Sequence, residues 1–391
     1  MVFYVDTLRQ DVASDPTIMP HAVELAKQSL EFKRVYAPGS DTQHSLPGIT
    51  SGSYDKPEKS PGDVLEVAQK AKLERVLIIP QSAYEFLSKL RPTFEFDRAI
   101  QISDYRPERK EVWGYGADQP TSERIVDRAL EWIEEKKDRP FFLWLFHFDQ
   151  HNWRELDKDW VHGTAAKYEI PDEGLIKWRY RVVAHSIDRE LQRLLDGLHR
   201  HGLDKNTIVV FVSDHGEGLG RDGFWVHAVF LWDSLVRVPL TIRVPGLGHR
   251  VVYDKVSLVD LAPTLARYLT DDPPSADYDG EDLLSYLIDK PPKRRHPILL
   301  SGVSQDNLVR VGIVDPERDW KLVLPLESGS PELYDLSVSD PDWLSVAEEH
   351  PTDVARLLSQ LVRPPVFPRS GDDVDVRERE ERAAASSAAK R

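Results

Sequence analysis

The stretch VVFVSDHGEGLG, residues 209–220, decides the fold. Its first four residues are β-branched or aromatic, which predicts a fully buried strand. Asp214 and His215 follow at the carboxyl end of that strand, where open α/β sheets place their chemistry, and these two side chains suit one metal ion. Gly216 is expected to turn the backbone sharply away, and Glu217 to orient its neighbours. A polar loop that only closes a strand is the alternative, and the pair alone does not decide between the two.

Length, charge and composition narrow the class of protein. The 391 residues suit one large α/β domain, or a large domain with a small appendage. A net charge of −15 argues against non-specific binding to nucleic acid or anionic membranes, but not against a small anionic substrate at a metal site. The chain has no cysteine, which excludes disulfides, thiolate metal sites and cysteine nucleophiles. The longest apolar run, residues 141–146, is too short to span a bilayer.

The start of the chain bears on where the protein works. It opens directly on MVFYVD without a secretory leader, so as it stands the chain is expected to be cytoplasmic. A first strand that begins at residue 2 is abrupt, which leaves room for a missing upstream segment. The sequence therefore leaves the location open, and it leaves the oligomeric state open as well.

Strands and helices alternate through most of the chain. Strand patterns occur at residues 2–5, 75–80, 140–146, 208–212 and 240–244, and helical patterns at 20–30, 64–71, 122–135 and 175–201. Because parallel strands need crossover helices, this alternation predicts an α/β fold with a mostly parallel central sheet sandwiched by helices.

The pattern changes from about Pro292 onward, where the segments become shorter. Strands are expected at 298–301, 308–314 and 320–323, with a helix near 354–361, and beyond residue 370 the chain is charged and then rich in Ala and Ser. Such a tail is predicted to be disordered. We expect a catalytic α/β domain over 1–291, a small C-terminal α+β subdomain over 292–369, and a disordered tail over 370–391.

Further metal-ligand residue types stand where the predicted strands end. Asp6 follows the first strand, and His227 precedes a later one. His147, Asp149 and His151 end the strand at 140–146 with a spacing of two, which in an extended segment places them on one side. Each has an ordinary alternative, since Asp6 can cap a segment, His227 can be a loop histidine, and His147 suits a core position. Their shared place at strand ends favours a metal or anion site.

A hydroxyl nucleophile is available in the segment RVYAPGSDTQHSLPGITSG, residues 34–52. Thr42 and Ser45 are the candidates, because a hydroxyl attacks at neutral pH only when a base or a metal stabilises its alkoxide. A helix that begins here would also offer backbone N–H groups to an anionic ester. The alternative is a plain helix-capping segment. No G-x-S-x-G elbow supports a triad hydrolase.

Taken together and in order, these motifs resemble the sulfatase/alkaline phosphatase superfamily over nearly the whole chain. The segments that carry the resemblance are VDTLRQD at 5–11, SDTQHSLPGITSG at 40–52, PFFLWLFHFDQHNW at 140–153, VVFVSDHGEGLG at 209–220 and WVHAVFLWDSLVRVPLTIRVPG at 225–246. SLVDLAPTLARYL at 257–269 and the stretch from WKLVLP to PELYDLSVSDPDW, 320–343, resemble the sulfatase tail with its small C-terminal subdomain. The resemblance implies an alkaline phosphatase-like fold.

The resemblance also implies roles for individual residues. Asp6, Asp214 and His215 match the ligands of the core metal ion. Thr42 matches the nucleophile, which also touches that metal. In the mechanism this implies, Thr42 attacks phosphorus or sulfur in line, and water or an acceptor alcohol resolves the covalent intermediate.

Three further residues are implied near the substrate. His151 and His227 match residues that bind a second metal ion or the anionic oxygens of the substrate, so both count as catalytic candidates. Asp149 is a weaker candidate for the same group. The segment 84–116 is expected to shape the rim of the pocket.

Two departures from the sulfatases matter. Sulfatases convert a Cys or Ser in a C/S-x-P-x-R motif to formylglycine, whereas the equivalent residues here read TQHSL, 42–46, so we expect no formylglycine. This loop instead resembles the threonine loop of phosphoethanolamine and phosphoglycerol transferases, relatives that usually carry membrane helices absent from this chain. The Asp-His pair at 214–215 also differs from the Asp-Asn pair of calcium sulfatases. An imidazole among carboxylates favours Zn²⁺ or Mn²⁺ over Ca²⁺, as one or two ions.

The sequence thus predicts a metal-dependent hydrolase or transferase of the sulfatase family. It is expected to act on small anionic phosphate esters (monoesters, diesters or transferred phospho-substituents) through a metal-activated threonine. A sulfuric ester hydrolase is one alternative, which the missing formylglycine motif disfavours. A catalytically inactive binding protein with a sulfatase fold is the other, which the presence of the main metal ligands disfavours.

Overall fold

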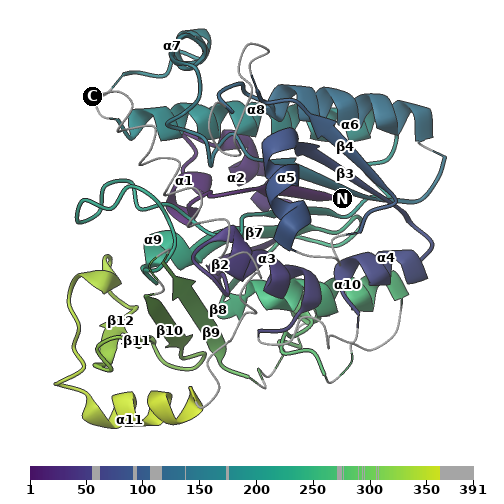
Figure 1. Ribbon diagram of the computed structural model, residues 1–391. Coiled ribbons are helices and arrows are strands. Elements are labelled where there is room, and N and C mark those ends of the chain that lie inside the picture. Colours follow the sequence, from purple (N-terminus) through teal and green to yellow (C-terminus); the bar gives the residue numbers. More distant parts are fainter. Residues whose placement is uncertain are drawn as a thin grey trace.

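The computed structural model describes residues 1–54, 62–90, 95–105, 117–136, 138–172, 176–270, 275, 277–288, 290–292, 294, 296–304, 306 and 308–361 (Figure 1). The tail predicted over 370–391 and much of the expected pocket rim at 84–116 lie outside these residues. None of the helices within the described ranges is both long enough and apolar enough to cross a membrane.

The main sheet has eight strands in the order β4-β3-β5-β1-β6-β7-β2-β8. Their bounds are β1 Val2–Val5, β2 Leu30–Tyr36, β3 Glu74–Pro80, β4 Arg98–Ile102, β5 Phe141–His147, β6 Val209–Val212, β7 Arg237–Arg243 and β8 Arg250–Ser257. Strand β7 is antiparallel to both of its neighbours, and the other strand pairs are parallel. The predicted mostly parallel sheet is therefore confirmed.

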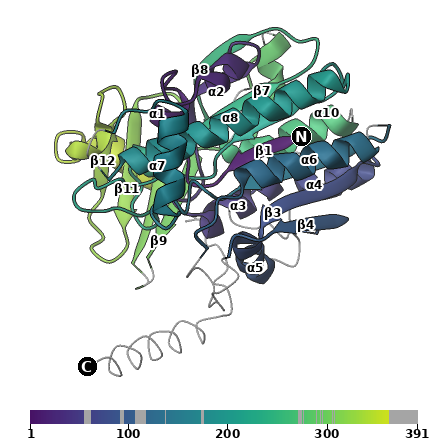
Figure 2. The same ribbon diagram turned by 90° about the horizontal axis from the view of Figure 1, so that it is seen from above.

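Helices cover both faces of this sheet, as Figure 1 and Figure 2 show. One face packs against α1 Gln10–Ala13, α2 Pro20–Ala26, α6 Ser122–Lys136, α7 Lys158–Lys167 and α8 Trp178–Arg200. The other packs against α3 Thr42–Ser51, α4 Val64–Lys70, α5 Gln81–Leu90 and α10 Leu261–Thr270. Alternation along β1 divides the core, since Phe3 and Val5 face the first group whereas Val2 and Tyr4 face the second. The sandwich predicted from the sequence is confirmed.

A second sheet of four antiparallel strands, the C-terminal sheet, lies beside the first (yellow-green in Figure 1). Its strands are β9 Ile298–Val303, β10 Val309–Val314, β11 Trp320–Pro325 and β12 Glu332–Asp335, and α11 spans Pro351–Gln360. Val354 and Leu357 of α11 pack on one face of this sheet. The opposite face packs against Leu235 and Val236 of α9, Asp233–Val236. Short 3₁₀ turns cover Leu258–Asp260, Leu283–Ile288 and Pro341–Trp343. A domain boundary near residue 292 remains a prediction.

One predicted element is wrong at its end. The helix expected over 20–30 stops at Ala26, and Leu30 already belongs to β2. The apolar residues at 30, 32 and 35 face the core because β2 pairs with β7 on one side and β8 on the other. These are contacts with residues more than 200 positions away, as Leu30 pairs with Ile242 and Arg250. Local periodicity therefore gave no sign of the strand.

Candidate active site

The candidate residues gather at one edge of the main sheet because of its strand directions. Asp6 follows β1, and Asp214 follows β6, which runs parallel to β1. Strand β2 leads from the same edge into α3, which begins at Thr42. Since β7 runs the opposite way, the segment before it, which carries His227, returns to this edge. The fold thus brings four separate parts of the chain together.

Asp6, Asp214 and His215 form a compact buried cluster. One ligand atom from each lies within 4.8 Å of the others. His215 Nε2 is 3.5 Å from Asp6 Oδ1 and 3.5 Å from Asp214 Oδ2, and all three side chains are buried. The two carboxylates lie close together, and no Lys or Arg in the described part of the chain forms an ion pair with either of them. A bound cation would neutralise their charge.

The chemistry of the three residues fits a metal ion. His215 Nδ1 lies 2.9 Å from the carbonyl oxygen of Gly216, so Nδ1 donates there and Nε2 keeps its lone pair toward the carboxylates. Asp214 Oδ2 is buried and has no hydrogen-bond partner among the described residues. Burial, reinforced by the charge of Asp214, raises the pKa of Asp6 well above its ordinary value. A divalent cation would offset both the burial of Asp214 Oδ2 without a hydrogen bond and the burial of a charged Asp6 carboxylate.

Thr42 presents its hydroxyl to this cluster. Its Oγ1 lies 3.1 Å from Asp6 Oδ2 and 3.2 Å from His215 Nε2. Thr42 is the first residue of α3, whose N-cap Asp41 accepts a hydrogen bond from the backbone N–H of His44. The other candidate, Ser45, donates its hydroxyl to the backbone oxygen of Asp214 at 2.8 Å. Of the two hydroxyls, that of Thr42 is therefore the one directed at the ligand atoms.

His227 and His151 stand next to the cluster. The ring centroid of His227 is 4.4 Å from that of His215 and 5.0 Å from that of His151, which stacks on Phe148 at 4.2 Å. Burial, together with the charge of His227, lowers the pKa of His151 well below its ordinary value. Burial acts the same way on His227, but the adjacent carboxylate of Glu217 outweighs it, so the pKa of His227 is raised. The two shifts thus favour the neutral form of His151 and the protonated form of His227.

Glu217 lies next to the Nδ1 atom of His227. Its Oε1 is 3.6 Å from His227 Nδ1. The same carboxylate accepts a hydrogen bond from Trp153 Nε1 at 3.1 Å and one from the backbone N–H of Gly218 at 3.2 Å. The orienting role expected of Glu217 is therefore directed at His227, which the sequence alone did not identify as its partner.

Two residues predicted on the same strand end do not join the group. The strand stops at His147 and the chain then turns, so Asp149 is not part of an extended segment. The Asp149 carboxylate accepts hydrogen bonds from the N–H and hydroxyl of Thr121 and from the N–H of Ser122, where α6 begins. His147 stacks on Phe3 inside the core, with ring centroids 4.1 Å apart. Asp149 therefore serves as a helix cap, and the expectation of a shared face for 147, 149 and 151 is wrong.

Two features near Thr42 differ from what the sequence indicated. Asp41 and His44 form a pair, with Asp41 oxygens 2.7 Å from His44 Nδ1, and the D-x-x-H spacing at a helix start was the available signal. Gly216 does not have a positive φ. A Cβ at this position would lie 2.0 Å from the backbone oxygen of Ser234, so the glycine permits a close approach rather than a special turn.

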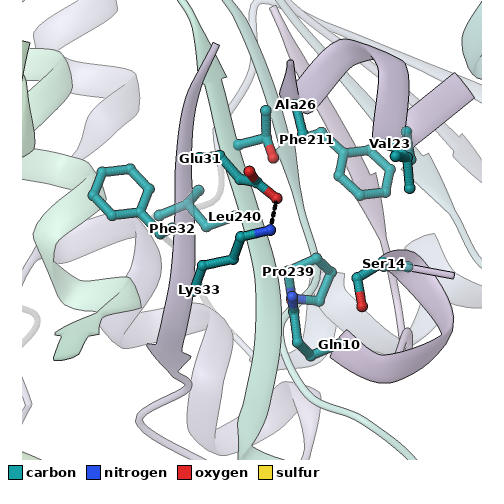
Figure 3. A pocket seen from close by; sticks show the side chains of 13 residues that line it. Gln10, Ser14, Val23, Ala26, Glu31, Phe32, Lys33, Phe211, Pro239 and Leu240 are labelled. Atoms are coloured by element: carbon teal, nitrogen blue, oxygen red, sulfur yellow. Dashed lines mark hydrogen bonds and ion pairs between the residues drawn. The ribbon is translucent and has the colours of Figure 1, made fainter. Parts of the chain in front are cut away.

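A separate pocket lies between α1, α2, β2 and β7 (Figure 3). Gln10, Ser14 and Pro239 line it, together with the ion pair between Lys33 and Glu31. None of the metal-cluster residues borders it. We assign no role in the chemistry to this pocket.

Comparisons with known proteins identify the family and the fold. The Sulfatase family model matches residues 6–271. An ulvan-active sulfatase from Formosa agariphila is 26% identical over 335 residues, which are 75% of this chain and 65% of the relative. The chain spans less than two thirds of the length of the curated relatives it matches first, at 22% and 65%.

Solved structures share the fold. The phosphonate monoester hydrolase of Silicibacter pomeroyi superposes with a TM-score of 0.72 at 18% identity, covering 93% of this chain and 94% of that one. The structure of BT4656 in complex with its substrate D-glucosamine-2-N,6-O-disulfate gives 0.66 at 16% identity, with 92% and 96% covered. At these identities the likeness shows the fold, and the chemistry has to be argued from the residues of this chain.

Proposed function

Because the chain belongs to the sulfatase family, we propose that it is a metal-dependent hydrolase or transferase acting on phosphate esters through Thr42. One observation carries this proposal. The Thr42 hydroxyl lies within 3.2 Å of ligand atoms from both Asp6 and His215, at the start of a helix. A nucleophile, a metal site and helix N–H donors at one point are what in-line transfer of an anionic group requires.

Each residue of the site then has a task. Asp6, Asp214 and His215 would hold the ion, and a bound Zn²⁺ or Mn²⁺ would stabilise the alkoxide form of Thr42 and the charge of the substrate oxygens. Thr42 Oγ1 loses its proton to solvent and attacks phosphorus, and the new O–P bond forms as the ester O–P bond opposite breaks. The departing oxygen takes up a proton from solvent, so that the alcohol leaves. The protonated His227 neutralises charge on the transferred group.

His151 remains neutral and offers a hydrogen bond to the same group. The phosphoryl group is then transferred from Thr42 to water in a hydrolase, or to an alcohol in a transferase. Which acceptor is used therefore determines the reaction class.

Sulfate esters are the second candidate, because relatives in the family include sulfatases. Formylglycine forms from Cys or Ser, however, and this chain has no cysteine and carries threonine at position 42. A threonine alkoxide suits transfer of a phosphoryl group through a covalent ester. We therefore place phosphate esters first.

The test uses purified protein stripped with EDTA and reloaded with Zn²⁺, Mn²⁺ or Ca²⁺. The substrates are 4-nitrophenyl phosphate, bis(4-nitrophenyl) phosphate, 4-nitrophenyl phenylphosphonate and 4-nitrophenyl sulfate. Thr42→Ala is expected to lower kcat by about a thousandfold, whereas its matched control Ser45→Ala retains most activity. Faster cleavage of the sulfate than of any phosphorus ester would overturn the substrate assignment. Full activity in Thr42→Ala would overturn the nucleophile.

A further inference from the structure

We propose that the C-terminal sheet belongs to the catalytic machinery, with Gly302 of β9 as the positioning residue that holds His227 against the loop leading to Thr42. This inference rests on the proposed function, because it assigns a task within the same reaction. It concerns two segments. The histidine loop is residues 224–232, and the nucleophile loop is residues 37–41, which ends directly before Thr42.

The histidine loop has an unfavourable backbone directly after His227. Ala228 and Val229 have φ values of 79° and 53°, in the left-handed region that favours glycine. Valine is particularly disfavoured there because its branched Cβ crowds the backbone. Such conformations persist only where surrounding contacts impose them, and they gather at functional sites. The contacts around these two residues therefore determine where His227 lies.

Gly302 supplies the closest of these contacts. A Cβ built on Gly302 would lie 2.4 Å from the backbone oxygen of Val229 and 2.9 Å from Oγ of Ser40. The N–H of Ala228 in turn donates to the backbone oxygen of Ser40 at 2.9 Å. The absence of a side chain at Gly302 thus allows β9 to approach both the backbone of the histidine loop and Ser40 of the nucleophile loop.

The neighbouring residue of β9 binds the nucleophile loop through its backbone. Ser301 donates its N–H to the oxygen of Pro38 at 2.9 Å, and the Ser301 oxygen accepts from the N–H of Ser40 at 3.2 Å. Ser40 stands two residues before Thr42 and adjoins the cap of α3. The dipeptide at 301–302 therefore contacts both the histidine loop, which carries His227, and the nucleophile loop, which leads to Thr42.

Side chains of the C-terminal sheet hold the far end of the histidine loop. The rings of Phe230 and Trp232 stack in parallel at 4.2 Å, and Arg310 of β10 lies over Phe230 at 4.6 Å. The buried Lys321 of β11 pairs with Asp233, the first residue of α9, at 2.7 Å. The C-terminal sheet thus contacts the strained pair through Gly302 and the end of the loop through Arg310 and Lys321, and His227 follows the position of that sheet.

Gly302→Ala tests this arrangement, because the new methyl group must displace Val229 or Ser40. The matched control is Leu357→Ala, which removes a buried contact from the opposite face of the same sheet. With the metal-loaded enzyme we expect Gly302→Ala to lower kcat by about tenfold to a hundredfold with little change in KM. In a His227→Ala background, Gly302→Ala is expected to lower kcat by less than about threefold, because the side chain that Gly302 positions is already absent. Leu357→Ala should keep kcat near that of the wild type.

Hydrogen exchange gives a readout independent of catalysis. Amides in residues 224–232 are expected to exchange about tenfold faster in Gly302→Ala and at the wild-type rate in Leu357→Ala. Unchanged exchange in Gly302→Ala, an equal loss of kcat in both backgrounds, or the same loss in Leu357→Ala overturns the inference. If the wild type cleaves none of the esters while exchange rises only in Gly302→Ala, the proposed function fails and the placement of the loop by Gly302 is supported.

Discussion

The hydroxyl oxygen of Thr42 lies 3.2 Å from Nε2 of His215, although 173 residues separate the two in the chain. That distance joins the start of α3 to the end of β6, with Asp6 Oδ2 3.1 Å from the same hydroxyl. The candidate site is therefore a product of strand order, because β1, β6 and β2 deliver their ends to one edge of the sheet. The predictions below separate the roles of the residues around this point.

Asp214→Asn is expected to abolish tight metal binding. The substitution replaces an anionic ligand whose Oδ2 has no other hydrogen-bond partner in the described part of the chain, so an affinity loss of about a hundredfold or more follows. Metal content after dialysis, measured by mass spectrometry of the bound ion, checks this. Asp188→Asn is the matched control. Asp188 is also a buried carboxylate, but it accepts hydrogen bonds from the backbone N–H groups of His21 and Ala22 at the start of α2. Wild-type metal content in Asp214→Asn would contradict the assignment.

Asp149→Ala is expected to lower stability and leave the metal in place. The carboxylate accepts hydrogen bonds from Thr121 and Ser122 at the start of α6, and losing this cap costs about 1–3 kcal/mol. Urea unfolding of the metal-free protein measures the change in free energy. If the variant instead has normal stability and a reduced metal content, Asp149 contributes to the metal site.

His147→Phe is expected to reduce the sensitivity of folding to acid. Burial lowers the pKa of His147 from 6.5 to about 3 in the folded protein. Below pH 6.5 the unfolded chain therefore binds a proton that the folded chain does not, so stability falls as pH falls toward 3. Between pH 7.5 and 5 this single group contributes a loss of about 2 kcal/mol, which phenylalanine removes while keeping the stack on Phe3.

The measurement for His147 is urea unfolding in EDTA at both pH values. EDTA removes the metal, whose own binding depends on pH. His162→Phe is the control, because His162 is exposed on α7 and should leave the pH dependence as it is. Identical pH dependence in His147→Phe and in the wild type would show that His147 is not held neutral in the core.

Glu217→Gln is expected to shift the pH profile of the reaction. Burial lowers the pKa of His227, and Glu217 reverses this, so the neutral amide should let the pKa fall. Since the proposed mechanism uses the protonated His227 to neutralise the transferred group, activity lost as pH rises should be lost at lower pH in the variant. The log of kcat/KM against pH measures the shift. Glu190→Gln, at a buried carboxylate on α8, is the control, and an unmoved profile in Glu217→Gln would argue against the pairing.

Several candidate site residues could be predicted from the sequence because the patterns that indicate them are local. Asp6, Asp214 and His215 directly follow short buried strands, and any parallel sheet brings such ends to one edge. Thr42 follows the same logic, since a capping Asp41 places it in the first turn of a helix. These patterns named the candidates, but they left open whether Asp214 and His215 only close a strand and whether Thr42 or Ser45 faces them.

Asp149 and His147 show where such reasoning fails. Their spacing suggested one face of an extended strand, but the chain turns after His147 and Asp149 binds the start of a helix that lies earlier in the sequence. Only the packed fold reveals that partner. The same holds for β2, whose first residue Leu30 falls within the predicted helix 20–30, because its neighbours β7 and β8 are distant in the chain.

The sequence by itself thus determined the layered α/β fold and indicated the candidates Asp6, Asp214 and His215, because buried strands and polar strand ends are local patterns. Tertiary structure alone decided which carboxylate stands behind His227, which hydroxyl faces the cluster, and why Gly302 must lack a side chain. Those relationships join segments far apart in the chain through close backbone approach and burial. No spacing of residues along a sequence encodes such contacts, since they exist only once the two sheets have packed.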